Sequence, residues 1–596
     1  MSDIAPIIRP RSIGLLALSL LGVAMGVGTG LGAVGFRALI AVIHNFMFLG
    51  TFSFYYDANV FTAPSPWAAG IILVPVIGSL VVTFLVTKFA PEAKGHGVPE
   101  VMDAIFYQQG IIRPQVAIVK SLASASSIGT GGSVGREGPI IQIGASIGST
   151  LGQLIQMSPW QRITLVAAGA GAGIAATFNT PIGGVMFAIE LMLPEVSART
   201  FLPVALSTGT ATFIGRLFLG TQPAFFVPPT PTLGTHAGSA VSLLLYAILG
   251  GLCGLAATGF IRGLHVAEDW FAKIGNPYLR HAAGMLGIGV LIYALFHFYG
   301  HYFVEGVGYA TIQAVLLNRI DTFGILALLF AAKLIATSTT LGSGASGGIF
   351  SPSLFMGATL GGAFGALVDF IHPMPEASIP ALAIIGMCAM VGSGTGAAMT
   401  AVTMLFEMTR DYEIVMPMIL AVAVAVGVRR MLSRENIYTI KLVARRHFIP
   451  KALHANMFLV RPAAEVMDKD ILVLPAETRF DDFLKRPEHT GGLAHVVVTD
   501  KGRIVGILRV NTALRRGLED RYTGVNLGQI AQRNFTVARG DDIAYEVIRR
   551  MWRKNAAMAV VVDSKRRIPD ASDVIGVISK EHVADSVAAS VAPYEA

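Results

Sequence analysis

The stretches GTGGSVGREGPIIQIG, residues 129–144, and GSGASGGIFSPSLFMGA, residues 342–358, decide the fold of this chain. In each, a glycine-rich run ends in a proline that an apolar segment follows, which predicts a loop and then an abrupt helix start. A helix N-terminus has unpaired backbone N–H groups and carries about half a positive elementary charge. Two such ends inside a membrane would bind an anion. Glu137 adds a carboxylate at one of them, which suggests a gate or a proton carrier.

Charge is scarce over most of the 596 residues, of which 53% are hydrophobic and 14% charged. Soluble proteins of this size carry about a quarter of charged residues. Eight stretches lack Asp, Glu, Lys and Arg and exceed the ~20 residues that cross a bilayer; they are 12–36, 58–87, 138–161, 163–189, 217–261, 281–304, 334–368 and 377–406. The chain is therefore predicted to be an all-α polytopic membrane protein rather than one with a large soluble core.

Basic residues flank the apolar region and predict the side of the membrane on which each terminus lies. Arg9 and Arg11 precede the first apolar run, and a basic cluster follows the last one, formed by Arg429, Arg430, Arg434, Lys441, Arg445 and Arg446. Both termini are expected in the cytoplasm. These residues account for the net charge of +8, so no nucleic-acid partner is predicted.

Two parts of the apolar region carry the same elements in the same order. Residues 95–190 and 305–407 each contain a glycine-rich loop, a proline-led helix and a glutamate that ends an apolar run, Glu190 or Glu407. This predicts an internal repeat with the site between its halves. The predicted domains are a transmembrane domain at 1–440, with halves at about 12–215 and 240–440, a linker at 441–460 and a cytoplasmic domain at 461–590.

The C-terminal region is charged and alternates strand and helix patterns. His495–Val498 and Ile504–Leu508 flank a turn, and a similar pair follows at Ala559–Asp563 and Val574–Ile578. A helical pattern follows each strand–turn–strand unit. The region is predicted to be a soluble α/β domain of two similar modules.

These motifs resemble the CLC family of chloride channels and chloride/proton exchangers. The resemblance is carried by GREGP at 135–139, GGIFSP at 347–352 and GHGVP at 95–99, where the family usually has GSGIP. The tail resembles the paired CBS modules often appended to that family. The resemblance implies an inverted repeat of broken and tilted helices, a homodimer with one anion pathway per subunit, and no enzymatic activity.

The resemblance also assigns roles to individual residues. Glu137 matches the external gating glutamate, which blocks the anion path when ionised and leaves it when protonated; capping of its own helix is the alternative. The implied chloride contacts are His96, Gly97, Arg136, Gly138, the backbone N–H groups of Ile349 and Phe350, and the hydroxyl of Tyr438. The alternative for Tyr438 is an interfacial tyrosine. No metal site is predicted.

Two positions depart from the family pattern. His96 stands where the family usually has a serine, and its imidazole can still donate to chloride, which would make conduction depend on internal pH or alter anion selectivity. The alternative is a histidine that faces away. Leu191 stands where exchangers carry an inner proton glutamate, and leucine cannot carry a proton. Channel members have an apolar residue there, although some exchangers lack the glutamate.

Two lysines, Lys120 and Lys333, lie in the apolar region before the two loops. Charged residues inside a membrane are costly and usually functional, so both are candidates for raising the positive potential along the anion path. The alternative is that each snorkels to the surface from a helix end.

The CBS-like tail lacks the expected ribose-binding residues. The usual pattern has an aspartate six residues after a strand glycine, whereas Gly506 leads to Thr512 and Gly576 to His582. Adenine nucleotide is therefore disfavoured as a cofactor, and no other cofactor is predicted. Dimerisation or pH sensing is the alternative role of the tail.

We predict a chloride permease of the CLC type in a bacterial inner (plasma) membrane, gated by protonation of Glu137. Leu191 favours a passive voltage- or pH-gated channel, and a chloride/proton antiporter is the alternative. A fluoride exporter and a membrane-anchored CBS sensor are more distant alternatives. The predicted partners are chloride, protons in the case of an antiporter, the lipid bilayer and a second copy of the chain.

Overall fold

The computed structural model describes residues 12–227, 240–371, 378–449, 460–484, 495–509, 524–563 and 570–583. The chain divides into two compact units, Met1–Phe448 and Ile449–Ala596. Arg9, Arg11 and Thr512 lie outside the described residues. The predicted domain boundaries remain predictions.

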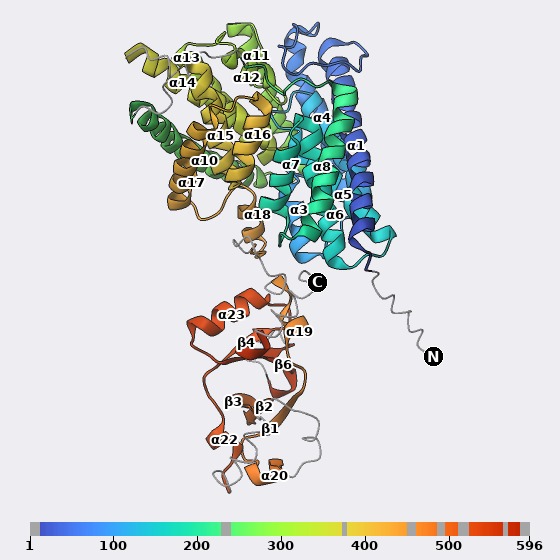
Figure 1. Ribbon diagram of the computed structural model, residues 1–596, viewed down its shortest axis with the longest axis vertical. Helices are drawn as coiled ribbons and strands as arrows, with labels where there is room; N and C mark the ends of the chain where they lie inside the picture. The colour runs from blue at the N-terminus through green and yellow to red at the C-terminus, as the bar shows by residue number, and fades with distance from the viewer. Residues whose placement is uncertain are drawn as a thin grey trace. The chain divides into compact units, whose positions relative to one another are not determined.

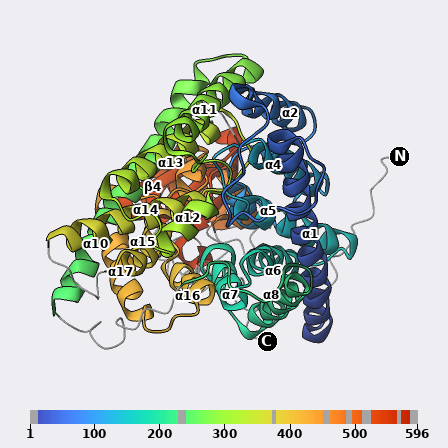
Figure 2. The same ribbon diagram turned by 90° about the horizontal axis from the view of Figure 1, so that it is seen from above.

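The first unit is helical, and its two halves lie beside one another (Figures 1 and 2). The first half contains α1 (Leu15–Leu49), α2 (Val74–Lys88), α3 (Val98–Tyr107), α4 (Gln115–Gly129), α5 (Glu137–Leu154), α6 (Pro159–Phe178), α7 (Pro181–Phe187) and α8 (Ala198–Leu219). The second half contains α10 (Ala240–Ala272), α11 (Pro277–Tyr299), α12 (Tyr309–Leu316), α13 (Phe323–Ser343), α14 (Phe350–Ile371), α15 (Ile379–Thr395), α16 (Ala398–Thr409) and α17 (Val415–Leu432). The short α18 (Thr439–Ala444) follows.

Among the described residues, eight helices are long and apolar enough to cross a membrane. Many of their large apolar side chains face outward, such as Leu16, Phe213 and Met431, as the lipid-facing side of a helix requires. Several other helices are short, because glycine and proline interrupt the apolar runs. The unit is a multi-pass integral membrane domain, as the sequence predicts.

Glycines let the helices at the centre of each half approach closely. Gly144 of α5 and Gly169 of α6 face one another so closely that a Cβ on either would meet the other's carbonyl. Gly357 of α14 and Gly386 of α15 have the same relation in the second half. Without a hydrophobic driving force between helices in lipid, this close packing holds the bundle together.

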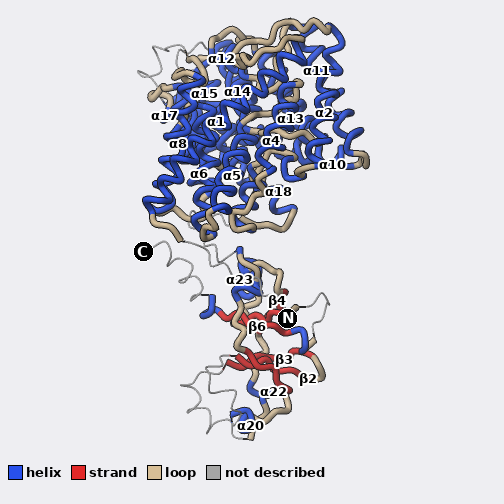
Figure 3. The backbone as a smooth tube through the Cα atoms, turned by 90° about the vertical axis from the view of Figure 1, so that its right-hand side faces the viewer, coloured by secondary structure: helices blue, strands red, loops and turns tan. Residues whose placement is uncertain are grey.

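The second unit contains two three-stranded sheets of the same topology (Figure 3). In the first, β1 (Ile471–Pro475) runs parallel to β2 (His495–Asp500), which is antiparallel to β3 (Arg503–Arg509). In the second, β4 (Phe535–Arg539), β5 (Met558–Val562) and β6 (Val574–Ser579) repeat this order. The α-helices in the described part of this unit are α19 (Ala463–Val466), α20 (Phe480–Leu484), α22 (Leu527–Ile530) and α23 (Ala544–Arg553).

The alternation of side chains along the central strands explains how the two modules pack. Val496 and Val498 of β2 belong to the core of the first module, whereas Val497 points to the opposite face. There it joins Val560 of β5 in a core shared by the two sheets. The α/β prediction for the tail is confirmed.

Candidate functional site

The carboxylate of Glu137 lies where the starts of α5 and α14 meet. Its side chain is fully buried. The backbone N–H of Ser351 donates to Oε2 at 3.2 Å, and the Ser351 hydroxyl lies 2.6 Å from both carboxylate oxygens. The carboxyl group therefore occupies the first turn of a helix from the other half of the chain, a position where a helix N-terminus favours negative charge.

Tyr309 completes this cluster from a third helix start. Its hydroxyl donates to Oε1 of Glu137 and lies 3.0 Å from the hydroxyl of Ser351. The guanidinium of Arg136 lies over its ring, 5.0 Å from the centroid. Tyr309 is the first residue of α12, so three helix starts converge on one carboxylate.

Backbone bridges between the two halves fix the position of these starts. Gly135 and Gly348 exchange two hydrogen bonds, with N···O distances of 2.7 and 2.6 Å. Gly95 donates to the carbonyl of Ala345 at 3.0 Å, and Gly347 donates to the carbonyl of Gly95 at 3.2 Å. The three loops named by the sequence motifs are thus joined into one structure.

His96 lies in this junction with an unsatisfied side chain. It is 1% exposed, and neither ring nitrogen has a hydrogen-bond partner among the described residues. Its backbone oxygen lies so close to Gly138 that a Cβ there would collide with it. The ring centroid of buried Tyr438 lies 6.5 Å from that of His96. A buried imidazole without a partner is costly, and an anion would satisfy it.

The remaining predicted anion contacts come from the backbone. Within the described residues, no acceptor pairs with the N–H groups of Ile349 or Phe350, at the start of α14. Gly97 has a φ of 85° and caps α3, a conformation that favours glycine. A Cβ at Gly97 would lie 3.0 Å from the carbonyl of Gly138. The predicted anion site therefore includes unpaired donors at the start of α14 and a close approach between Gly97 and Gly138.

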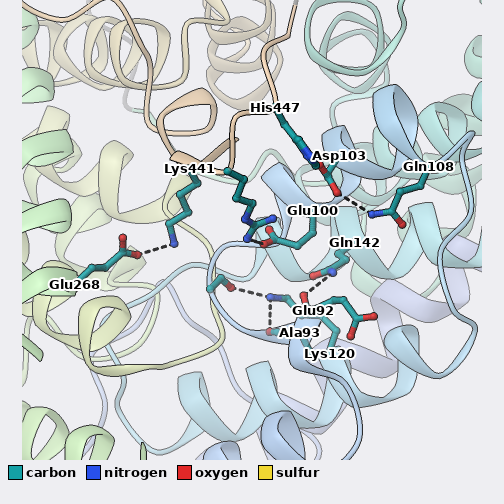
Figure 4. Close-up of polar contacts among 12 residues, drawn as sticks. Glu92, Ala93, Glu100, Asp103, Gln108, Lys120, Gln142, Glu268, Lys441 and His447 are labelled. Atoms are coloured by element: carbon teal, nitrogen blue, oxygen red, sulfur yellow. Dashed lines mark hydrogen bonds and ion pairs between the residues drawn. The ribbon is translucent and has the colours of Figure 1, made fainter. Parts of the chain in front are cut away.

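The two intramembrane lysines hold loops rather than reach the surface. Both are fully buried. The ammonium of Lys120 donates to the carbonyls of Ala93 and Gly95, at 3.0 and 2.7 Å (Figure 4). The ammonium of Lys333 donates to the carbonyls of Val304 and Gly306, at 3.1 and 3.0 Å. Each lysine therefore fixes the loop that precedes a short helix, α3 or α12, and its predicted contribution to the positive potential stays a prediction.

The glutamates that end the repeated apolar runs cap each other's helices. Glu407, in α16, accepts from the N–H groups of Ile182 and Gly183, at the start of α7. Glu190 accepts from the N–H groups of Met399 and Thr400, at the start of α16. This reciprocal arrangement requires α7 and α16 to run antiparallel, which supports an inverted repeat. Both glutamates thus satisfy backbone N–H groups at the start of a helix from the other half.

Leu191 follows Glu190 in a π-helical turn, Ala188–Met192, and its side chain is buried. It offers no group that can carry a proton.

The segment after Tyr438 is tied to α3 by two pairs of oppositely charged side chains (Figure 4). Arg445 forms an ion pair with Glu100 at 2.7 Å, and His447 pairs with Asp103. The two carboxylates lie three residues apart on α3, which is one helical turn. The helix that begins beside His96 is thereby fixed to the segment that begins at Tyr438.

Two site residues received no role in the sequence analysis: Tyr309 lies outside the motifs, and Ser351 lies inside the motif at 347–352. A signal for Tyr309 exists in the repeat, because Lys120 follows Gly95-His96-Gly97 much as Lys333 follows Gly306-Val307-Gly308. That alignment places Tyr309 at a helix start, next to a glycine with a φ of 78°.

Fold and site define a membrane protein of two inverted halves in which three helix starts meet at a buried carboxylate. The profile of the family described as "Voltage gated chloride channel" matches residues 78–430, more than half of the chain. The profile described as "CBS domain" matches residues 463–519. The chain belongs to the CLC family and carries a CBS region.

Named relatives include channels and exchangers. The "Chloride channel protein CLC-f" of Arabidopsis thaliana is 32% identical over 69% of this chain and 54% of that protein. The "H(+)/Cl(-) exchange transporter ClcA" of Vibrio parahaemolyticus is 32% identical over 63% of this chain and 79% of that protein. The protein of that name from Salmonella arizonae is 30% identical over 71% of this chain and 88% of that protein. The chain thus spans about half of the plant relative and most of the bacterial ones.

Solved structures agree on the fold. A slow cyanobacterial Cl⁻/H⁺ antiporter superposes with a TM-score of 0.62 and 25% identity, covering 72% of this chain and 97% of that one. A eukaryotic CLC transporter covers 95% of this chain and 97% of that one with a TM-score of 0.58; at 20% identity it supports the fold alone.

Proposed function

We propose that this protein exchanges chloride for protons across a membrane, with Glu137 as both gate and proton carrier. The observation that carries this proposal is the position of the Glu137 carboxylate. It accepts from the Ser351 N–H, the Ser351 hydroxyl and the Tyr309 hydroxyl, which are donors that an anion would use.

A single group can serve both roles because protonation removes its charge. An ionised carboxylate competes with chloride for the same donors and closes the path. A protonated carboxyl is a weaker acceptor, so it leaves the donors to chloride and carries its proton as it moves. Chloride and proton movements are then coupled through one side chain.

The relatives named as H⁺/Cl⁻ exchangers favour exchange over the passive channel that Leu191 suggests. An exchanger still needs a proton route on the inner side that bypasses Leu191. We propose His96 for this role, because a histidine side chain can carry a proton, both of its buried ring nitrogens lack a partner among the described residues, and its backbone oxygen lies against Gly138 at the start of α5. Chloride beside the ring would stabilise the protonated imidazole. Binding of chloride and binding of a proton at His96 would then favour each other.

We also propose a homodimer through the face formed by α7 and α16. Ile182 and Met399 on this face are 54% and 57% exposed, and Glu190 and Glu407 beside them are only half-buried. Carboxylates that face hydrocarbon are costly, so a second copy that covers them would be stabilising.

The proposed location is a bacterial inner membrane with both termini in the cytoplasm, where the CBS region would regulate transport without bound nucleotide.

The test uses purified protein in liposomes under a chloride gradient, with the voltage clamped by potassium and valinomycin. Chloride and external protons are recorded together. We expect uphill proton movement driven by chloride. Chloride flux without proton movement would contradict exchange and leave a channel. Absence of chloride flux from a folded protein would contradict both, and fluoride flux or a sensor role would remain.

A further inference from the structure

A cavity of about 280 Å³ adjoins the gate. Arg136 lines it and precedes Glu137 in the chain, and Tyr309, whose hydroxyl donates to Glu137, also lines it. We propose that this cavity binds a divalent oxyanion, such as sulfate or hydrogenphosphate, which controls access of chloride to the gate. This inference rests on the proposed role of Glu137 but needs no proton coupling.

The net positive charge of the cavity lining favours binding of an anion. Three arginines line it, namely Arg37, Arg136 and Arg216, whereas Asp57 is the acidic residue among the lining residues. Full ionisation leaves two positive charges in excess. Like charges in a confined space repel one another more strongly than in open water. A dianion would balance them.

Two of the guanidinium groups have no ion-pair partner among the residues that the structure describes. No ion pair joins Arg37 or Arg136 to a carboxylate in the described part of the chain. Arg136 is 9% exposed, and its Nε has no hydrogen-bond partner there. The guanidinium lies over the face of the Tyr309 ring, and this contact holds the group in place without neutralising its charge. An unpaired buried donor of this kind indicates a missing acceptor.

The shape of the donors favours an oxyanion over chloride. A guanidinium presents its N–H groups as a planar fork, which two oxygens of a carboxylate, sulfate or phosphate match. The fork of Arg216 is oriented by a bond from its Nε to Oδ1 of Asn179, at 2.6 Å. Since one water occupies about 30 Å³ in the liquid, the cavity is far larger than a single small ion needs. It accommodates a tetrahedral anion with several waters.

An anion bound in the cavity would directly affect the approach of chloride to Glu137. An anion held by Arg136 lies beside the residue that carries the gating carboxylate, in a cavity that Tyr309 also lines. Chloride that approaches Glu137 by this route meets both charge repulsion and a filled space. The occupant is therefore expected to inhibit chloride exchange in competition with chloride.

The test measures chloride exchange by the full-length protein in liposomes, with sulfate added on the side of the cavity at constant ionic strength. We expect the sulfate concentration that gives half-inhibition to fall as the chloride concentration is lowered. Arg37→Gln should raise the half-inhibitory sulfate concentration at least about tenfold, because a charge-assisted bond is lost. Arg37→Lys, which keeps the charge but not the fork, should give an intermediate value. Arg319→Gln, an exposed arginine outside the cavity lining, should leave the inhibition unchanged.

Direct binding provides a second readout that does not need transport. Calorimetry in chloride-free buffer should show sulfate binding to the wild type and weaker binding to Arg37→Gln. Equal inhibition and equal binding in wild type and Arg37→Gln would overturn the proposal, as would absence of sulfate binding to the wild type. Loss of proton coupling would contradict the proposed exchange yet leave both sulfate readouts intact, so the two failures are distinguishable.

Discussion

At the start of α5 the first half of the membrane domain carries Glu137, whereas at the start of α14 the second half carries Phe350. The loops before the short helices differ in the same way. Gly97 and Gly308 cap α3 and α12 with φ values of 85° and 78°. When the two halves are aligned on these glycines, His96 corresponds to Val307, and Val98 corresponds to Tyr309.

The framework around these positions is the same in both halves. Each half uses a buried lysine to hold two carbonyls, and each uses a glutamate to cap the other's helix. Backbone groups in a membrane must be satisfied whatever the protein does, so these contacts are repeated. The chemistry depends on positions where the halves differ, and there one half supplies the acid and the other the donors.

The largest effect is expected where the halves agree. Lys120→Met and Lys333→Met each remove two hydrogen bonds that a buried amino group donates to backbone carbonyls, so each should lower the free energy of unfolding by about 2 kcal/mol or more. Thermal melting in detergent measures this. The repeat predicts similar losses for the two variants. A variant at one position that melts like the wild type, while the other does not, would show that only one half needs its lysine.

A smaller effect is expected at a position where the halves differ. Tyr309→Phe removes a hydrogen bond to the ionised form of Glu137, and such bonds contribute about 1.5–3 kcal/mol. Its loss favours the protonated gate, so the midpoint of the chloride flux against external pH should rise by about 1–2 pH units. Tyr302→Phe, whose hydroxyl accepts from the Ser65 N–H instead, is the control. An unchanged midpoint in Tyr309→Phe would remove Tyr309 from the gate.

The other differing position, His96, should affect coupling more than flux. His96→Ser keeps a donor for chloride but cannot carry a proton at neutral pH. We expect chloride flux to persist while the number of protons moved per chloride falls and the dependence on internal pH disappears. Simultaneous chloride and proton recordings measure both. Full coupling in His96→Ser would place the inner proton route elsewhere.

The smallest effect is expected in the tail, where burial lowers the pKa of His495 although Asp468 lies 3.2 Å from its Nδ1. An unfolded histidine titrates near a pKa of about 6.5. Below that pH the unfolded state binds more protons than the native one, so the tail should lose stability as the pH falls. Hydrogen exchange of the β2 amides in the full chain should show this loss and its reduction in His495→Asn. Equal acid sensitivity in that variant would assign it to other groups.

Much of this architecture could be predicted from the sequence because strong physical constraints leave clear patterns. Stretches without charge reveal membrane spans, and the Gly–Pro pattern before α5 and α14 reveals two helix starts. Strand alternation in 495–508 and 559–578 reveals the tail modules. Glu137 could be singled out because a carboxylate beside a helix start inside a membrane is rare.

The partners of Glu137 could not be predicted in the same way. Ser351 lies inside the motif at 347–352 and Tyr309 lies outside the motifs, but both are polar residues of ordinary types, and neither position shows locally that its hydroxyl meets Glu137. Their role depends on the bridge between Gly135 and Gly348, which lie more than two hundred positions apart. The cavity over the gate likewise combines arginines from α1, the α5 loop and α8. Such sites follow from tertiary packing, not from a motif.

The most direct test of the central claim, that one carboxylate gates the path, compares chloride flux against external pH in the wild type and Glu137→Gln. In the wild type, each pH unit above the midpoint should reduce the protonated gate, and the flux, about tenfold. Glu137→Gln should conduct at all pH values without proton uptake, whereas Glu413→Gln, an exposed glutamate, should behave like the wild type. Retention of the wild-type pH profile in Glu137→Gln would contradict the account.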